Sequence, residues 1–261
     1  MTLRNFFIAA FIIIITVSCG QPDQEWNSYG MDLSNQRFSR ITQINKTNVE
    51  TLEMAWQVQT GVPATFQSTP IVHEGVMFVS LPFNNVLALD AKTGNEIWRY
   101  EHDLNPNWKL CCGPSNRGVA LQGKQLFFGT VDARLISLNI KTGEKIWDIN
   151  VVKNNVETES ISDLDKTDAN SEKQVSGGTG VGISMAPVVY NGKVIIGITG
   201  VGYGLHVEEE GSNTPLGAVV GVSGKYGRSG FLAAYDIHSG QQIWQFNTIL
   251  KSGWEGNFNN F

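Results

Sequence analysis

Cysteine and charge are both scarce in this chain of 261 residues. Three cysteines, two of them adjacent, are too few to staple a small disulfide-dependent fold. Lysine and arginine total 19 against 24 aspartates and glutamates, with no run of basic residues, which argues against a nucleic-acid partner. Glycine and tryptophan, at 28 and 7 residues, are plentiful by contrast, and they favour turn-rich β structure with aromatic anchors.

The amino-terminal stretch at 1–18 has the pattern of a secretory signal. The run from Phe6 to Val17 is almost unbroken apolar, and its roughly 12 residues are too few to span a bilayer, which needs about 20. Cys19 follows the small residue Ser18, as in a bacterial lipoprotein signal, so we expect Cys19 to be lipidated. The alternative is an ordinary signal peptide cleaved nearby, which leaves Cys19 as a spare thiol. Either signal takes the chain out of the cytoplasm, and the lipid anchor predicts a membrane-attached protein of the periplasm.

A repeat of two hairpins dominates the rest of the chain. One hairpin has an alternating apolar strand, a Thr-Gly or Ser-Gly turn and a second strand opening with Ile-Trp, at 88–98, 137–147 and 234–244. A second hairpin precedes each copy, at 70–79, 119–128 and 187–196. The spacing of about 50 residues between the first two copies is typical of propellers and solenoids. Two hairpins make a four-stranded blade, so the sequence predicts an all-β propeller.

Three blades are expected within a partial propeller over residues 51–261, after an amino-terminal lead-in at 19–50. The blades cover about 62–100, 115–150 and 183–248, and insertions at 152–182 and 205–227 enlarge the third. Residues 52–61 are typical of a lone outer strand, which in a propeller completes the last blade. A propeller needs at least four blades. We therefore expect the chain to be part of a longer product or to need a partner that closes the ring.

Two adjacent cysteines, Cys111 and Cys112, lie between the first two expected blades, ahead of Asn116-Arg117-Gly118. Neighbouring Cα atoms are about 3.8 Å apart, below the usual range for a disulfide of about 4.4–6.8 Å. A bond between these cysteines would therefore close a strained eight-membered ring, which is stiff, flat and apolar and suits a lid over a planar ligand. The alternative is two buried free thiols that act as small hydrophobic groups.

Several motifs together resemble the pyrroloquinoline-quinone (PQQ) dehydrogenases, most closely the methanol and ethanol branch. They are the stretch 26–39, the stretch 44–49, the Thr-Gly-x-x-Ile-Trp repeats and the Cys-Cys…Asn-Arg-Gly loop. The resemblance runs from about Trp26 to Trp244 and covers the amino-terminal portion of that family's eight-bladed fold. It implies a quinoprotein dehydrogenase that oxidises an alcohol or sugar, using PQQ and a calcium or lanthanide ion. It also implies electron transfer to cytochrome c or a membrane quinone.

The resemblance also implies which residues would contact PQQ. In the family a vicinal disulfide packs on one face of the quinone, which corresponds to Cys111 and Cys112. An arginine pairs with a PQQ carboxylate, which corresponds to Arg117 and suits the fork geometry of a guanidinium. The remaining matches are a cofactor-binding hydroxyl at Ser184 and a short run lining the ring at Thr199, Gly200 and Val201. Taken without the resemblance, Arg117 would form a surface ion pair, and Ser184 and Thr199 would cap turns.

Two positions depart from the family pattern. Gln67 stands where the family places a glutamate against PQQ, and it keeps a hydrogen-bond acceptor but loses the charge. Gly202 stands where the family has a glutamate that binds the metal ion, and glycine offers no side-chain ligand. The remaining metal ligands and the aspartate base of the family would all follow Phe261. We therefore expect no catalytic residue and no metal ligand in this chain.

Two other functions stay open. Lipoproteins with the same blade repeat act as non-enzymatic scaffolds in outer-membrane protein assembly, and the signal and the missing metal ligand suit that function. A degenerate dehydrogenase that binds PQQ without metal or turnover would suit Gln67 and Gly202. The loop with Cys111, Cys112 and Arg117 favours the dehydrogenase, because a scaffold has no use for a lid over a quinone.

Overall fold

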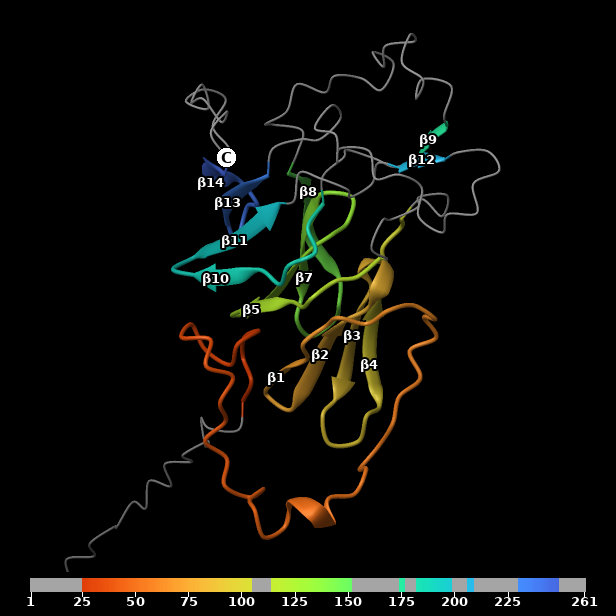
Figure 1. Cartoon of the computed structure of the whole chain (residues 1–261). Helices are drawn as coiled ribbons and strands as arrows, with labels where there is room; N and C mark the ends of the chain where they lie inside the picture. The colour runs from red at the N-terminus through yellow and green to blue at the C-terminus, as the bar shows by residue number, and fades with distance from the viewer. Residues whose placement is uncertain are drawn as a thin grey trace, which may run out of the picture.

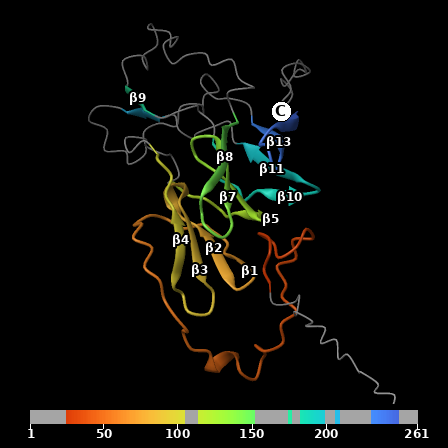
Figure 2. The same ribbon diagram turned by 180° about the vertical axis from the view of Figure 1, so that it is seen from behind.

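Three four-stranded antiparallel sheets form the main part of the structure (Figures 1 and 2). The computed structural model describes residues 25–104, 114–151, 182–198 and 230–248, and the backbone at 174–176 and 206–208. In the first two sheets, hydrogen-bonded neighbours are consecutive strands, and in the third the same order holds except that β12, which belongs to a separate pair, comes between β11 and β13 in the chain. Each of the three sheets is therefore a meander of two antiparallel hairpins. This arrangement confirms the prediction of an all-β fold built from four-stranded propeller blades.

In each of the three sheets the first strand has three residues and the other three strands have five or six. The first sheet contains β1 (Ile71–His73), β2 (Val76–Ser80), β3 (Val86–Asp90) and β4 (Glu96–Tyr100). The second contains β5 (Ala120–Gln122), β6 (Gln125–Gly129), β7 (Arg134–Asn139) and β8 (Lys145–Asn150). The third contains β10 (Val188–Tyr190), β11 (Lys193–Ile198), β13 (Phe231–Asp236) and β14 (Gln242–Asn247). A separate pair joins β9 (Gln174–Ser176) to β12 (His206–Glu208).

Helical structure is limited to short 3-10 turns in the part of the chain that the structure describes. These are η2 (Val49–Thr51) and η3 (Pro82–Asn84). No helix among the described residues is long and apolar enough to cross a membrane.

The meander topology separates two ends of each blade. The loop between β2 and β3 and the connection that follows β4 lie at one end, which we call the site end. The turn between β3 and β4 lies at the opposite end, which we call the turn end. Hydrogen bonds hold the site-end loops of neighbouring blades together, because Phe83 N donates to Pro114 O at 2.9 Å and Ile183 N donates to Thr130 O at 2.9 Å. Residues before the first strand of every blade therefore meet at one end of the molecule.

The turn between the third and fourth strands is built in the same way in all three blades. In the first blade, Asp90 Oδ1 accepts hydrogen bonds from Thr93 N and Thr93 Oγ1 at 2.8 and 2.9 Å. Gly94 then takes a left-handed backbone with φ of +75°. Asn139 and Asp236 accept the equivalent backbone bonds in the other blades, from Thr142 N and Ser239 N. The Ser239 hydroxyl also donates to Asp236, whereas the Thr142 hydroxyl donates to Glu144 instead. The repeated Thr-Gly and Ser-Gly motifs thus encode a side-chain-capped turn that requires positive φ.

Tryptophan side chains join neighbouring blades at the turn end. The Nε1 of Trp98 donates to Ile140 O at 3.0 Å, and its ring covers Gly143, whose φ is +72°. Two further tryptophans repeat both contacts, Trp56 with Ala91 O and Gly94, and Trp147 with Ile237 O and Gly240. A Cβ on Gly143 would lie 2.6 Å from Trp98 Cε3. The Ile-Trp half of the repeat therefore packs on the glycine of the next blade.

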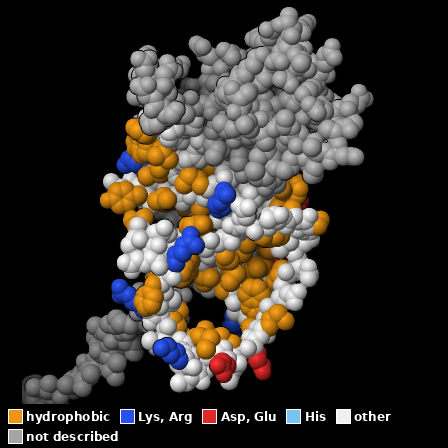
Figure 3. Space-filling model, in the orientation of Figure 1, with side chains coloured by type: hydrophobic (Ala, Val, Ile, Leu, Met, Phe, Trp, Pro, Cys, Tyr) orange, Lys and Arg blue, Asp and Glu red, His pale blue; other side chains and the backbone are white. Residues whose placement is uncertain are grey.

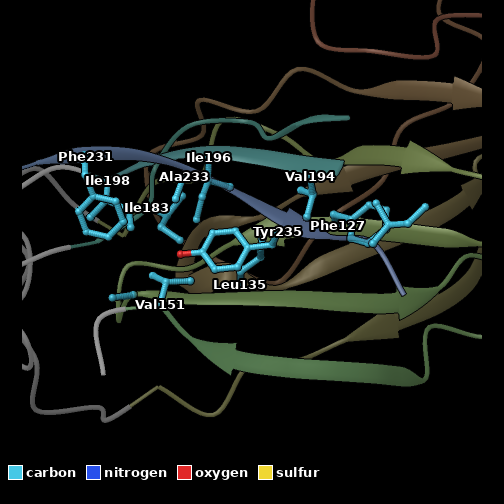
Figure 4. Packing of buried hydrophobic residues seen from close by; sticks show 12 residues of the cluster. Phe127, Leu135, Val151, Ile183, Val194, Ile196, Ile198, Phe231, Ala233 and Tyr235 are labelled. Atoms are coloured by element: carbon cyan, nitrogen blue, oxygen red, sulfur yellow. The ribbon is translucent and has the colours of Figure 1, made fainter. Parts of the chain in front are cut away.

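Hydrophobic clusters fill the spaces between the sheets. One cluster joins the first and second blades and includes Phe78, Trp98 and Phe128. Another joins the second and third blades, and Figure 4 shows Leu135 of β7, Ile196 of β11 and Tyr235 of β13 packed against one another in it. Strands β3, β6 and β7 are buried along nearly their whole length, because side chains on both of their faces pack against neighbouring elements.

The segment before the first blade runs along the outside of the sheets. It begins with a short bridge in which Trp26 N donates to Val72 O at 2.9 Å and Val72 N donates to Trp26 O at 3.0 Å. Residues 52–61, expected as a lone outer strand, form no strand with any described residue. The segment carries exposed hydrophobic side chains, including Phe38 and Met54, and Figure 3 shows the hollow that the chain encloses at its lower end.

Candidate cofactor site

Backbone hydrogen bonds join the residues that precede the first strand of each blade at the site end. Thr69 N of the first blade donates to Arg117 O of the second at 3.1 Å. Arg117 N donates in turn to Ser184 O of the third at 3.0 Å. Gly118 follows Arg117, and a Cβ there would lie 3.2 Å from Ala186 Cβ, so the three chain segments approach closely. The backbone of Arg117 is thereby the link between all three blades.

The Arg117 side chain contacts Ser184, the other described residue that the resemblance assigns to cofactor binding and that lies close to it. Its Nη1 donates to Ser184 Oγ at 2.6 Å and lies 3.5 Å from Ser184 O. Ser184 is 6% exposed. Within the described residues, the guanidinium forms no ion pair with a carboxylate. Because Ser184 Oγ accepts the bond from Arg117, its own hydroxyl hydrogen remains available for an acceptor on a ligand.

A cavity of about 750 Å³ lies beside this pair. Arg117 lines it, whereas Ser184 does not and directly precedes the lining residues that begin at Met185. The amino-terminal segment lines one side of it, with Tyr29 and Asp32, and the inner strands of the second and third blades line the other, with Leu121 and Val189. Arg117 is the cationic side chain of the lining. The volume lies within the range of about 300–1,000 Å³ that small-molecule sites occupy. A mostly apolar wall with one guanidinium suits a small ligand that carries an anionic group.

The Asp32 carboxylate is the anionic group of the same lining. Hydrogen bonds from Ser34 lower the pKa of Asp32 below its usual value. The carboxylate accepts a hydrogen bond from its own turn, because Ser34 N donates to Asp32 Oδ1 at 2.9 Å. It does not neutralise Arg117 across the cavity, since the structure records no ion pair between them.

Gln67 lies outside this arrangement. Its side chain is exposed, and it does not line the cavity. It forms no hydrogen bond with Arg117 or Ser184. The structure thus brings Arg117 and Ser184 together and leaves Gln67 apart from them.

The other predicted site residues lie outside the described part of the chain. They are Cys19, Cys111, Cys112, Thr199, Gly200, Val201 and Gly202. Among the residues that are described, no group of three histidine, cysteine, aspartate or glutamate side chains is placed to hold a metal ion.

A buried histidine–aspartate pair lies at the site end and was not found by sequence reasoning, which assigned the histidines no role. His102 Nε2 lies 3.0 Å from both carboxylate oxygens of Asp132, and the His102 side chain is 6% exposed. Burial raises the pKa of Asp132, but the hydrogen bond and the electrostatic interaction with His102, together with other hydrogen bonds, outweigh it. The net shift of the Asp132 pKa is downward. His102 N also donates to Asn85 Oδ1 at 2.9 Å. The pair fixes the connection after β4 against both blades.

Comparison with known proteins identifies close relatives of the chain. A family model described as the glucose/ethanol/alcohol dehydrogenase β-propeller domain matches residues 26–259. The quinohemoprotein alcohol dehydrogenase ADH IIB of Pseudomonas putida is 32% identical over 231 residues, which make up 88% of this chain and 27% of the relative.

Solved structures show the same relationship. The crystal structure of quinohemoprotein alcohol dehydrogenase from Comamonas testosteroni matches with a TM-score of 0.64 at 31% identity, over 86% of this chain and 27% of that one. A europium-containing methanol dehydrogenase matches with a TM-score of 0.62 at 26% identity, over 85% of this chain and 32% of that one. The chain therefore spans less than a third of the length of these three proteins. It belongs to the family of PQQ β-propeller domains found in glucose, ethanol and alcohol dehydrogenases.

Proposed function

We propose that the chain is part of a quinoprotein dehydrogenase and that it binds PQQ through Arg117 and Ser184. The observation that carries the proposal is a half-buried guanidinium that lines a cavity and that has, among the described residues, a hydroxyl rather than a carboxylate as its side-chain partner. A guanidinium without an anionic partner favours a carboxylate-bearing ligand. PQQ carries carboxylates on a planar quinone.

The described residues fit such a ligand. Arg117 supplies a cationic fork for one carboxylate, and the Ser184 hydroxyl supplies a second donor beside it. Ser28 also lines the cavity, and its buried Oγ has no hydrogen-bond partner among the residues that the structure describes. A buried polar atom without a partner is costly unless a ligand or water completes its bonding. When bound, PQQ supplies the quinone that accepts the electrons removed from the substrate.

The metal ion of the family does not fit this chain as well as PQQ does. Gly202 offers no side chain at the position of the metal-binding glutamate, and the described residues hold no ligand cluster. We therefore assign no step to a calcium or lanthanide ion within this chain.

The proposed substrate is an alcohol. The relatives are named as alcohol and methanol dehydrogenases, which supports an alcohol over a sugar. The names quinohemoprotein and dehydrogenase subunit among the relatives support a cytochrome as the electron acceptor. The motif ending at Cys19 supports a location in the periplasm, with attachment to a membrane through a lipid.

PQQ binding to the purified chain tests the proposal. Titration of micromolar PQQ, followed by quenching of tryptophan fluorescence, should show saturable binding. Arg117→Gln should weaken it by roughly tenfold or more, because charge-assisted bonds to a carboxylate are the strong ones. Lys124→Gln is the matched control, since it removes an exposed positive charge at the turn end and should leave binding unchanged.

Two results would overturn the proposal. Absence of saturable PQQ binding by the wild-type chain would favour the non-enzymatic scaffold. Binding that Arg117→Gln leaves intact would place the ligand elsewhere.

A further inference from the structure

The side chain of Asn116, which directly precedes Arg117, makes two buried hydrogen bonds with residues that follow Arg117 in the chain. Asn116 is 2% exposed. Its Nδ2 donates to Gly129 O at 2.7 Å, and its Oδ1 accepts from Gly118 N at 3.0 Å. One side chain thus ties the residue after Arg117 to the end of β6. The carboxamide is suited to both tasks, because it carries a donor and an acceptor on one short side chain.

Together with the bonds between blades, these hydrogen bonds restrain the backbone of Arg117. Arg117 N and O are already held by Ser184 O and Thr69 N in the neighbouring blades. Gly118 has φ of +148° and lies close to Ala186, so the chain has little room to relax after the arginine. With its backbone held on every side, Arg117 can direct its guanidinium to Ser184 at little further loss of entropy.

We propose that Asn116 is a positioning residue for ligand binding, which acts by holding Arg117 so that its guanidinium faces the cavity beside Ser184. This inference rests on the proposed function, in which Arg117 binds a PQQ carboxylate. Asn116 does not line the cavity and therefore acts through Arg117. Loss of its two hydrogen bonds frees the loop, so the guanidinium loses its fixed approach to the carboxylate.

A double-mutant cycle on PQQ affinity tests this role. Asn116→Ala should weaken PQQ binding by roughly tenfold, the order expected when a charge-assisted bond is misaligned. In the Arg117→Gln background, the same change should have almost no further effect, because the group that it positions is already gone. A residue with a purely structural role would weaken binding by the same factor in both backgrounds.

Gln125→Ala is the matched control for lost stability. Gln125 is a buried amide at the turn end, where its Nε2 donates to Ser137 Oγ at 3.0 Å and to Ile237 O at 2.9 Å. Its removal should lower the denaturation midpoint to an extent similar to Asn116→Ala but leave PQQ affinity unchanged. If Asn116→Ala does not fold, Asn116→Ser takes its place in the cycle, because a hydroxyl can still serve one of the two bonds.

The outcomes separate this inference from the proposed function. If the wild-type chain binds no PQQ, the proposed function fails and the positioning role fails with it. If the wild-type chain binds PQQ and the Asn116 variant binds equally well, the positioning role alone is wrong. Equal losses in the presence and absence of Arg117 would also contradict it.

Discussion

At the scale of single residues, the site end combines groups that are distant in sequence. Arg117 and Ser184 are separated by 67 positions and meet at 2.6 Å. The resemblance to PQQ dehydrogenases implied that each of them contacts the cofactor, but it did not predict their contact with each other. His102 and Asp132 could not be predicted as a pair, because their contact depends on how two blades pack. The two side chains nevertheless form a buried hydrogen-bonded pair that sequence reasoning can locate only after the blades are placed.

The lowered pKa of Asp132 makes the stability of the fold depend on pH. A carboxyl whose pKa is depressed on folding stabilises the fold above its unfolded pKa, and this contribution is lost as the pH falls through the folded pKa. Asp132→Asn should lower the free energy of unfolding by about 1–3 kcal/mol at pH 7. The difference between variant and wild type should begin to shrink as the pH falls below about 4, the ordinary pKa of an aspartate, and should vanish only below the lower pKa of the folded Asp132 carboxyl. Urea unfolding at several pH values measures both effects.

An exposed ion pair offers the control for this prediction. Arg99 Nη2 lies 2.8 Å from Glu96 Oε2 on the surface of β4. Glu96→Gln should change stability by less than about 1 kcal/mol at pH 7, as exposed pairs do. A loss in Asp132→Asn no larger than in Glu96→Gln would show that the buried pair does not stabilise the fold.

At the scale of elements, the repeat predicts each blade well and the contacts between blades poorly. Alternation of apolar residues and the Thr-Gly turns locate the strands, because both are local signals. The packing of each tryptophan on the next blade's glycine is a long-range contact that local patterns do not contain. The same limit applies to Asn116, whose partner Gly129 lies at the far end of the following hairpin. The local sequence pattern thus predicts the strands of a blade, whereas the contacts between blades depend on tertiary packing.

Gly143→Ala should disturb the junction between the first two blades. A Cβ there meets the Trp98 ring at 2.6 Å, on a backbone with φ of +72°. We expect a loss of about 2–4 kcal/mol in the free energy of unfolding, from steric overlap added to left-handed strain. Equilibrium denaturation in urea, followed by tryptophan fluorescence, measures it.

Gly123→Ala provides a control with the same backbone conformation and no overlap. Gly123 has φ of +60°, and nothing lies within 4 Å of its added Cβ. Its loss should stay near the backbone strain alone, about 1 kcal/mol. Equal losses at Gly123 and Gly143 would show that the tryptophan contact contributes nothing to joining the blades.

At the scale of the whole molecule, three blades form an arc that covers a small part of the matched relatives. The third blade presents Trp244 and Phe246 of β14 with exposed fractions of 40% and 61%. Trp56, Trp98 and Trp147 each donate to a backbone carbonyl of a neighbouring blade. Trp244 forms no such bond with any described residue. In the part that the structure describes, the face of the third blade that carries these two side chains is thus left exposed.

The central claim is that the site end of this arc binds PQQ through Arg117 and Ser184. An experimental structure of the chain with PQQ tests it most directly. The account predicts a PQQ carboxylate within hydrogen-bond distance of the Arg117 guanidinium, with the Ser184 hydroxyl as a second donor. PQQ bound away from Arg117, or a complex in which Arg117 keeps Ser184 as its sole partner, would contradict it.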